Sequence, residues 1–150
     1  MRSYTDEVRK QTLDAIKRIA RGQAIAAGVP EDRMPIVKVD DDFTPAMYND
    51  PALTMRLVGV FKSWFSETNV NHKKPEMGGE DFSEYGRTPD KIPICQFGLG
   101  AVSPESVKES ERTGKSLPSL HSPLFAPVPE PTIKTGVTAM TAAVLELMKK

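Results

Sequence analysis

One histidine, His121 in the stretch Leu-His-Ser-Pro at 120–123, has the chemistry to bind a metal ion or to transfer a proton. Imidazole is the commonest metal ligand in proteins and a frequent general acid or base. The residue lies in a proline-rich loop, between an apolar run that ends at Gly100 and a final stretch with strong helical periodicity. Local context also allows an ordinary loop histidine, so the assignment depends on the rest of the chain.

A second stretch with chemical potential is Met-Gly-Gly-Glu-Asp-Phe at 77–82. Paired glycines allow a positive φ or a close approach of another backbone. Glu80 and Asp81 are expected to open a short helix, because carboxylates complement the positive end of the helix dipole. The same turn could instead deliver Glu80 into a cleft as a functional carboxylate. Both interpretations stay open at this point.

The other candidates for chemistry are weaker. His72 is surrounded by Asn71, Lys73 and Lys74, which is typical of an exposed histidine. The single cysteine, Cys95, excludes an internal disulfide framework and any Cys-x-x-Cys metal site. Because Cys95 lies within an apolar run, we expect an inert thiol in the core.

Composition limits the classes of partner. The chain has 150 residues, enough for one modest domain, and its 20 basic and 20 acidic residues cancel. With no net charge, neither nucleic acid nor an anionic membrane is expected as a partner. No apolar run is long enough to span a bilayer, and the polar first residues do not form a signal peptide. The given chain therefore carries no targeting signal, and the location would be cytoplasmic if the complete protein also lacks one.

The first 44 residues predict a strand–helix–strand unit. Residues 2–4 are read as the end of a strand, and Thr5 then caps a helix whose apolar residues recur at helical spacing until Gly28. Residues 34–39 are rich in β-branched side chains and predict a second strand. Residues 40–49 are acidic and then contain Pro45, which indicates a linker and a domain boundary.

The rest of the chain alternates expected helices and strands. Asp50 caps a helix with Pro51 at its first position, and the aromatic residues of this helix are expected in the core rather than on a ligand platform. A short polar strand is expected at 69–73, and the apolar run 92–99 predicts a strand buried on both faces. A short helix is expected near 104–111. The final helix is expected from about Thr132, with an apolar stripe: Ile133, Val137, Met140, Val144 and Leu147.

These elements predict an α/β fold, in which functional groups gather in loops beyond the carboxyl ends of strands. Glu80 and His121 could therefore converge on one site. At this point the two motifs, in this order and about forty residues apart, resemble the M20 metallopeptidase superfamily. The likeness is greatest to its amidohydrolase branch, which includes hippurate hydrolase, N-acyl-amino-acid amidohydrolases and plant auxin-conjugate hydrolases. Three further stretches agree with the resemblance: residues 2–9, residues 48–53 and the last helix from Ile133.

The resemblance implies a catalytic α/β domain that binds two metal ions, with an inserted satellite domain used for dimerisation. Residues 1–44 would be the last strand–helix–strand of that ferredoxin-like satellite domain. Residues 45–150 would be the C-terminal half of the mixed-sheet catalytic domain. The family's Cys/His pair, Glu-Glu pair and further His lie earlier in its chain and have no counterpart here, so this sequence matches only the last third or so of such an enzyme.

Carried over by position, the resemblance makes His121 the family's last metal-ligand histidine. The complete site would hold two divalent ions, with Zn²⁺, Mn²⁺, Ni²⁺ or Co²⁺ suited to imidazole. Glu80 would lie beside the metal centre, behind the ligands or facing the substrate. Arg2 would bind a substrate carboxylate through its guanidinium group. No catalytic residue is assigned within this chain, because the pair Glu80–Asp81 is not the missing Glu-Glu pair whose first member would be the general base.

In the complete family, the metal ions lower the pKa of a bridging water, a Glu takes its proton, and the hydroxide attacks the amide of an N-acyl amino acid or small peptide. A catalytic site needs about three protein ligands and an open position, and this chain supplies His121 at most. We therefore expect a C-terminal fragment of a metal-dependent amidohydrolase that is inactive alone, from an enzyme that is a homodimer through its satellite domain.

Two other functions stay open. A non-enzymatic relic or dimerisation module would keep the scaffold without the chemistry, and the absent metal ligands favour this for the isolated polypeptide. An unrelated small α/β binding domain is the third possibility. In every case, a strand–helix–strand of 44 residues is close to the lower size limit of a stable domain and would present open strand edges. We therefore expect association or marginal stability.

Overall fold

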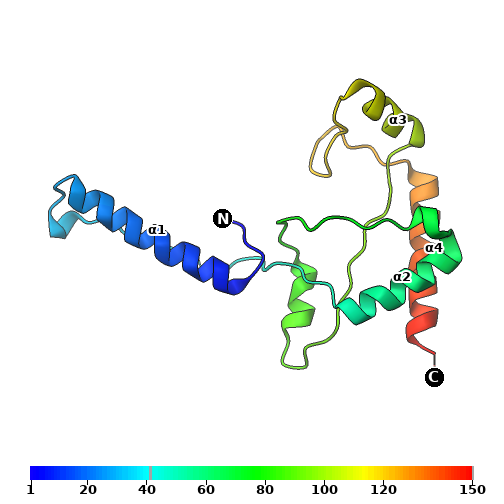
Figure 1. Ribbon diagram of the computed structural model, residues 1–150, viewed down its shortest axis with the longest axis horizontal. Coiled ribbons are helices and arrows are strands. Elements are labelled where there is room, and N and C mark those ends of the chain that lie inside the picture. Colours follow the sequence, from blue (N-terminus) through cyan, green and yellow to red (C-terminus); the bar gives the residue numbers. More distant parts are fainter. Residues whose placement is uncertain (41, 150) are drawn as a thin grey trace. The chain divides into compact units, whose positions relative to one another are not determined.

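The computed structural model describes residues 1–40 and 42–149, and all regular elements in that part of the chain are helices (Figure 1). The α-helices are α1 (Asp6–Ala26), α2 (Pro51–Phe65), α3 (Pro104–Thr113) and α4 (Pro129–Leu147). The short 3₁₀ helices are η1 (Glu31–Arg33), η2 (Glu67–Asn69) and η3 (Asp81–Arg87). The chain forms two compact units, which we call unit 1 (Met1–Leu53 with His72–Cys95) and unit 2 (Thr54–Asn71 with Gln96–Lys150).

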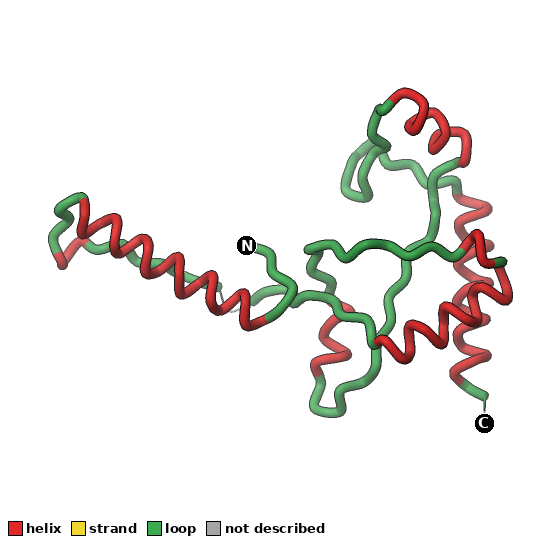
Figure 2. Tube along the Cα trace, viewed as in Figure 1, coloured by secondary structure: helices red, strands yellow, loops and turns green. Residues whose placement is uncertain are grey.

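The expected α/β fold is wrong, because the described residues contain no strand and no sheet (Figure 2). Residues 2–4, 34–39 and 92–99, expected as strands, form no ladder, and neither do residues 69–73. A single antiparallel bridge, between Ala46 and Gly79, is the backbone pairing that takes the place of a sheet in the described part of the chain. Neither the mixed-sheet catalytic domain nor the ferredoxin-like strand–helix–strand is therefore present.

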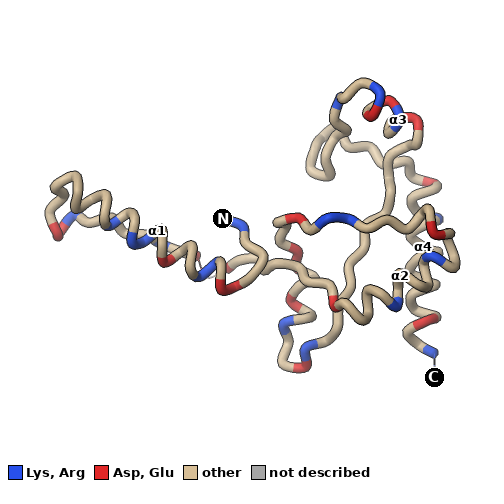
Figure 3. Tube along the Cα trace, viewed as in Figure 1, with Lys and Arg blue, Asp and Glu red and all other residues tan. Residues whose placement is uncertain are grey.

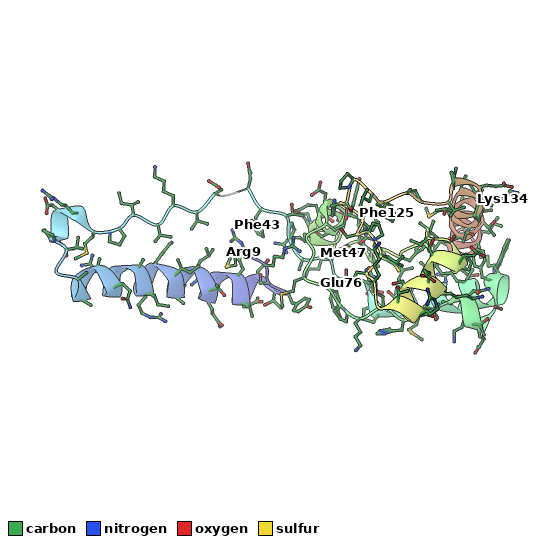
Figure 4. The ribbon with its side chains drawn as sticks, turned by 90° about the horizontal axis from the view of Figure 1, so that it is seen from above. Arg9, Phe43, Met47, Glu76, Phe125 and Lys134 are labelled. Atoms are coloured by element: carbon green, nitrogen blue, oxygen red, sulfur yellow. The ribbon has the colours of Figure 1, made fainter. Side chains whose placement is uncertain are left out.

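Residues 92–99 show why the apolar pattern predicted a strand that is not formed. A strand buried on both faces needs neighbouring strands and covering helices, whereas a pattern reports only the preference of its own segment. Ile94 is buried against Gly86, but Ile92 and Leu99 stay exposed. Residues 34–40 run alongside α1 instead of pairing with another strand, and Ile36 is 83% exposed there (Figures 1 and 4).

The helix boundaries predicted from capping residues are largely confirmed. Thr5 Oγ1 accepts the backbone N–H of Val8 at 3.2 Å at the start of α1, and Gly28 follows its end with a φ of +71°. Asp50 Oδ1 accepts the N–H of Leu53 at 2.7 Å, next to Pro51 at the start of α2. These contacts satisfy donors that the first turn of a helix leaves free, which is why the sequence locates helix starts well.

In unit 2, the buried side chains of α2 are large and those of α4 are small. Leu57 and Phe61 of α2 are buried, and the Phe61 ring centroid lies 4.8 Å from that of Phe97. The buried residues of α4 are Ala139, Ala142 and Ala143. The prediction that the aromatic residues of α2 form the core is thus confirmed for Phe61, but it is wrong for Trp64, which is 52% exposed.

The predicted apolar stripe of α4 lies on the exposed side of the helix. Its five members are between 46% and 64% exposed: Ile133, Val137, Met140, Val144 and Leu147. The helix begins at Pro129, three residues before the expected start, and it has no charged residue between Lys134 and Glu146 (Figure 3). The buried face of α4 is therefore the one with small side chains, and its large apolar side chains are left about half exposed.

An ion pair between α2 and α4 makes the stability of unit 2 sensitive to acid. Arg56 donates to the Glu146 carboxylate at 3.0 Å and to its carbonyl oxygen at 2.7 Å. Hydrogen bonds from Lys149 and then Arg56 lower the pKa of Glu146 below its usual 4.5. Because this pKa is lower in the folded state than in the unfolded state, the stabilisation is complete above about pH 4.5 and is lost as the pH falls through the folded value.

We predict that Glu146→Gln flattens the acid limb of the stability curve. The melting temperature of the wild-type chain should fall more between pH 5 and pH 3 than that of the variant, which has no charge to lose. Glu130→Gln is the matched control, because Glu130 pairs with Lys134 on the same helix at the surface. Equal acid sensitivity of wild type and Glu146→Gln, measured by circular dichroism melts, would contradict the prediction.

Candidate functional site

In unit 1, the N-terminal segment contacts the chain just before the glycine–carboxylate motif and at its first residue. Arg2 Nη1 donates to the carbonyl oxygen of Met77 at 3.0 Å, across 75 residues of sequence. The Tyr4 hydroxyl donates to the carbonyl oxygen of Pro75 at 3.3 Å. The fold therefore brings together two of the elements that the sequence singled out, Arg2 and the motif.

A salt bridge between helices also joins these two parts of unit 1. Arg87, the last residue of η3, donates to the Asp6 carboxylate of α1 at 2.8 Å. This hydrogen bond raises the pKa of the Arg87 guanidinium. Asp6 lies in the first turn of α1, where its carboxylate complements the positive end of the helix dipole. It also has a distant partner, so it holds the end of η3 against the start of α1.

A cavity of about 340 Å³ lies where these segments meet in unit 1. Its lining residues include Arg2, Arg9, Phe43, Gly78 and Gly79. The Arg9 guanidinium carbon lies 3.8 Å from the centroid of the Phe43 ring, and the two side chains point toward each other (Figure 4). Arg9 has no role expected from the sequence, although the residue lies in the stretch 2–9 that agrees with the resemblance.

Gly79 is the member of the glycine pair for which a side chain has no room. A Cβ atom there would lie 3.0 Å from Thr44 Cβ and Cγ2 and 3.1 Å from the Thr44 carbonyl oxygen. At Gly78 nothing lies within 4 Å of such an atom, and neither glycine has a positive φ. Close approach, rather than a left-handed backbone, is therefore the reason for glycine at Gly79.

We predict opposite effects of alanine at these two neighbouring glycines. Gly79→Ala should destabilise the chain by about 1 kcal/mol, because its methyl group must displace backbone and side-chain atoms of Thr44. Gly78→Ala should be neutral or stabilising by up to about 1 kcal/mol, because alanine lowers the entropy of the unfolded chain without a clash. Urea denaturation followed by circular dichroism measures both. A loss of stability in Gly78→Ala as large as in Gly79→Ala would contradict the prediction.

The carboxylates of the motif open η3, as one interpretation expected. Asp81 lies in the first turn, and Glu80 is the residue before it, half-buried and with an extended backbone. The Glu80 side chain makes no capping hydrogen bond to η3. Ser83 in η3 is 2% exposed, and its hydroxyl has no hydrogen-bond partner among the described residues. Gly79 is the last residue of the motif that lines the cavity, and Glu80 follows it directly in the chain without being a lining residue.

In unit 2, His121 lies in a tight turn and is exposed. The turn is closed by two backbone hydrogen bonds, from the Ser122 N–H to the Ser119 carbonyl at 2.9 Å and from the Phe125 N–H to the Ser122 carbonyl at 3.0 Å. Ser122 Oγ also accepts the Leu124 N–H at 3.2 Å. Glu80 belongs to unit 1 and His121 to unit 2.

The remaining ionisable candidates do not form a cluster. Among residues 1–40 and 42–149, no three His, Cys, Asp or Glu side chains are placed to hold a metal ion together. His72 is exposed, as expected, whereas Cys95 is half-buried rather than fully in the core. For an implied metal ion, His121 fits one ligand position, but the described residues do not form a complete site. No helix in the described chain has the length and apolar character needed to cross a membrane.

No family model matches the chain, and no solved structure matches it. The resemblance to amidohydrolases therefore depends on the residues of the two motifs and on their surroundings in each unit.

Proposed function

We propose that this chain is the C-terminal part of a metal-dependent amidohydrolase of the M20 type, which hydrolyses the amide bond of N-acyl amino acids or small peptides. The observation that carries the proposal is the meeting of Arg2 with the glycine motif at one cavity, although 75 residues separate Arg2 from Met77. Both elements belong to the resemblance, which assigns Arg2 to the substrate and places Glu80 of the motif beside the metal centre, behind the ligands or facing the substrate. The proposal does not use the sheet, which is absent from the described residues.

Arg2 is proposed to bind the carboxylate of the substrate. One of its terminal nitrogens donates to the Met77 carbonyl, which orients the guanidinium group at the cavity. A guanidinium group has five N–H donors, so others stay available for a bidentate pair with a carboxylate. The cavity volume of about 340 Å³ lies at the lower end of the range for small-molecule sites.

His121 is proposed to supply one ligand to a centre of two divalent ions, Zn²⁺, Mn²⁺, Ni²⁺ or Co²⁺. Its exposed position in a closed turn leaves the imidazole accessible to an ion held by other residues. Bound metal would supply Lewis acidity and a water of lowered pKa. Glu80 is proposed to lie near that centre and to orient a ligand or the substrate. The general base and the other ligands would come from a preceding part of the protein.

The exposed apolar surface of both units supports a chain that packs against further protein. In α1 no residue is buried, and Val8, Ile16, Ile19 and Ile25 are each more than 40% exposed. A helix of this kind gains most of its stability from packing of its apolar face. We propose that the complete enzyme covers such faces and is a homodimer through the segment 1–44. The same exposure favours a second candidate function, an interaction module that keeps the scaffold without the chemistry.

The experiment that tests the proposal starts from the coding sequence upstream of Met1. We expect an in-frame segment with a Cys/His pair, an adjacent Glu-Glu pair and a further His. The protein expressed with this segment should release glycine from hippurate when loaded with Mn²⁺, Co²⁺, Zn²⁺ or Ni²⁺, whereas residues 1–150 alone should not. An upstream segment without these ligands would favour the interaction module. Turnover by residues 1–150 alone, above that of its His121→Ala variant, would contradict the assignment as an inactive part.

A further inference from the structure

We infer that the cavity of unit 1 selects a ligand with two carboxylates, one for Arg2 and one for Arg9. The inference rests on the proposed function and narrows it, because amides of aspartate or glutamate would then be preferred to amides of a neutral amino acid, such as hippurate. The observation behind it is the charge of the lining. Two arginines are among the lining residues, and the acidic residue among them, Asp6, is already paired with Arg87.

Arg9 is suited to this role because its guanidinium group is held in place. Its guanidinium carbon lies 3.8 Å from the Phe43 ring centroid, so the planar group is positioned by the aromatic ring without using up its N–H donors. Arg9 is half-buried, and no described acidic side chain forms an ion pair with it. A stacked guanidinium with free donors loses little entropy when it binds a carboxylate bidentately.

The two arginines differ in what they already bind, which assigns the two carboxylates. Arg2 contacts the Met77 carbonyl beside the glycine motif, where the proposed function places the α-carboxylate of the substrate. Arg9 contacts Phe43 and has no carbonyl partner among the described residues, so a second carboxylate, on the amino-acid side chain, is the group left for it. A substrate with a neutral side chain would leave the Arg9 charge at the cavity uncompensated.

The test compares two nearly isosteric probes, N-acetyl-L-glutamate and N-acetyl-L-glutamine, by NMR titration of the full chain without metal. The wild-type chain should bind N-acetyl-L-glutamate about tenfold more tightly than N-acetyl-L-glutamine, as expected for one additional charge-assisted pair at a partly exposed site. Arg9→Gln should remove this preference while binding of the glutamine probe stays unchanged. Arg2→Gln should weaken the binding of both probes. Arg18→Gln, at an exposed position of α1 outside the cavity lining, is the matched control and should bind as wild type does.

Arg9→Lys distinguishes a loss of recognition from a loss of folding. Lysine keeps the positive charge without the planar guanidinium group, so this variant should retain part of the preference for the glutamate probe. Equal affinity of the wild-type chain for the two probes would overturn the inference, as would a preference that persists in Arg9→Gln or the absence of binding of either probe. Since the titration reads neither metal nor turnover, these outcomes leave the assignment of His121 intact. Conversely, an inactive complete enzyme that still prefers the glutamate probe would overturn the proposed function and leave the dicarboxylate site standing.

Discussion

His121→Ala is expected to lower kcat/KM of the complete, metal-loaded enzyme for hippurate by more than 100-fold. Loss of groups that only support metal ligands costs about 10- to 100-fold in affinity or activity, so loss of a ligand itself should cost more. The imidazole at the exposed turn has no other described contact whose loss would account for such an effect. The measurements are steady-state kinetics and the metal content of the purified protein, which should fall together.

His72→Ala is the matched control for this substitution. Both histidines are exposed, and both changes remove one imidazole, but His72 lies among Asn71, Lys73 and Lys74 outside either motif. We expect kcat/KM and metal content of His72→Ala to remain within a factor of two of wild type. A His121→Ala enzyme with wild-type activity would show that the histidine binds no essential metal. A similar loss in both variants would show a general effect of histidine removal rather than a ligand role.

The helices of this protein were predictable because their signals are local. Thr5 and Asp50 each cap a helix within three residues of their own position, and their hydrogen bonds are formed as expected. The expected strands are not formed, because a strand needs a second segment to pair with and a local pattern does not report one. Residues 92–99 have the composition of a buried strand, yet only Ile94 is buried among its large aliphatic side chains and no ladder forms. A single sequence cannot state which segment would pair with it.

The sequence motifs predicted which residues belong to the candidate site, but not which of these residues contact each other. Arg2 and the glycine motif were singled out separately, and their contact spans 75 residues that contain no signal of it. Arg9 was missed because its partner, the Phe43 ring, lies in residues 40–49, for which the sequence indicates a linker. The same limit explains α4: its periodicity shows one large apolar stripe, but the alanines of another face are the residues that are buried. Periodicity identifies apolar faces, and packing decides which one is covered.

Phe61→Ala is expected to unfold unit 2 or bring it close to unfolding. Phe61 is 8% exposed, and its ring meets Phe97 at 4.8 Å and Phe65 at 6.5 Å between centroids. Truncation of a buried phenylalanine costs about 3–5 kcal/mol. Unit 2 has roughly 70 residues, for which total stabilities of about 4–10 kcal/mol are usual, and its other buried side chains are one leucine and three alanines. Phe61→Ala should therefore remove most of the free energy of unfolding of unit 2.

Trp64→Ala separates burial from aromatic content in the same helix. The substitution Trp64→Ala removes an even larger ring, but the Trp64 side chain is 52% exposed. Its loss should therefore lower the free energy of unfolding by no more than about 1.5 kcal/mol. Urea denaturation followed by far-ultraviolet circular dichroism gives both values, and in Phe61→Ala the single tryptophan reports independently on α2 by fluorescence. If Trp64→Ala were as damaging as Phe61→Ala, the tryptophan would belong to the core, as the aromatic pattern first suggested. If neither mattered, the contact of Phe61 with Phe97 would not stabilise unit 2, and the stability of α2 would have to come from packing against other protein.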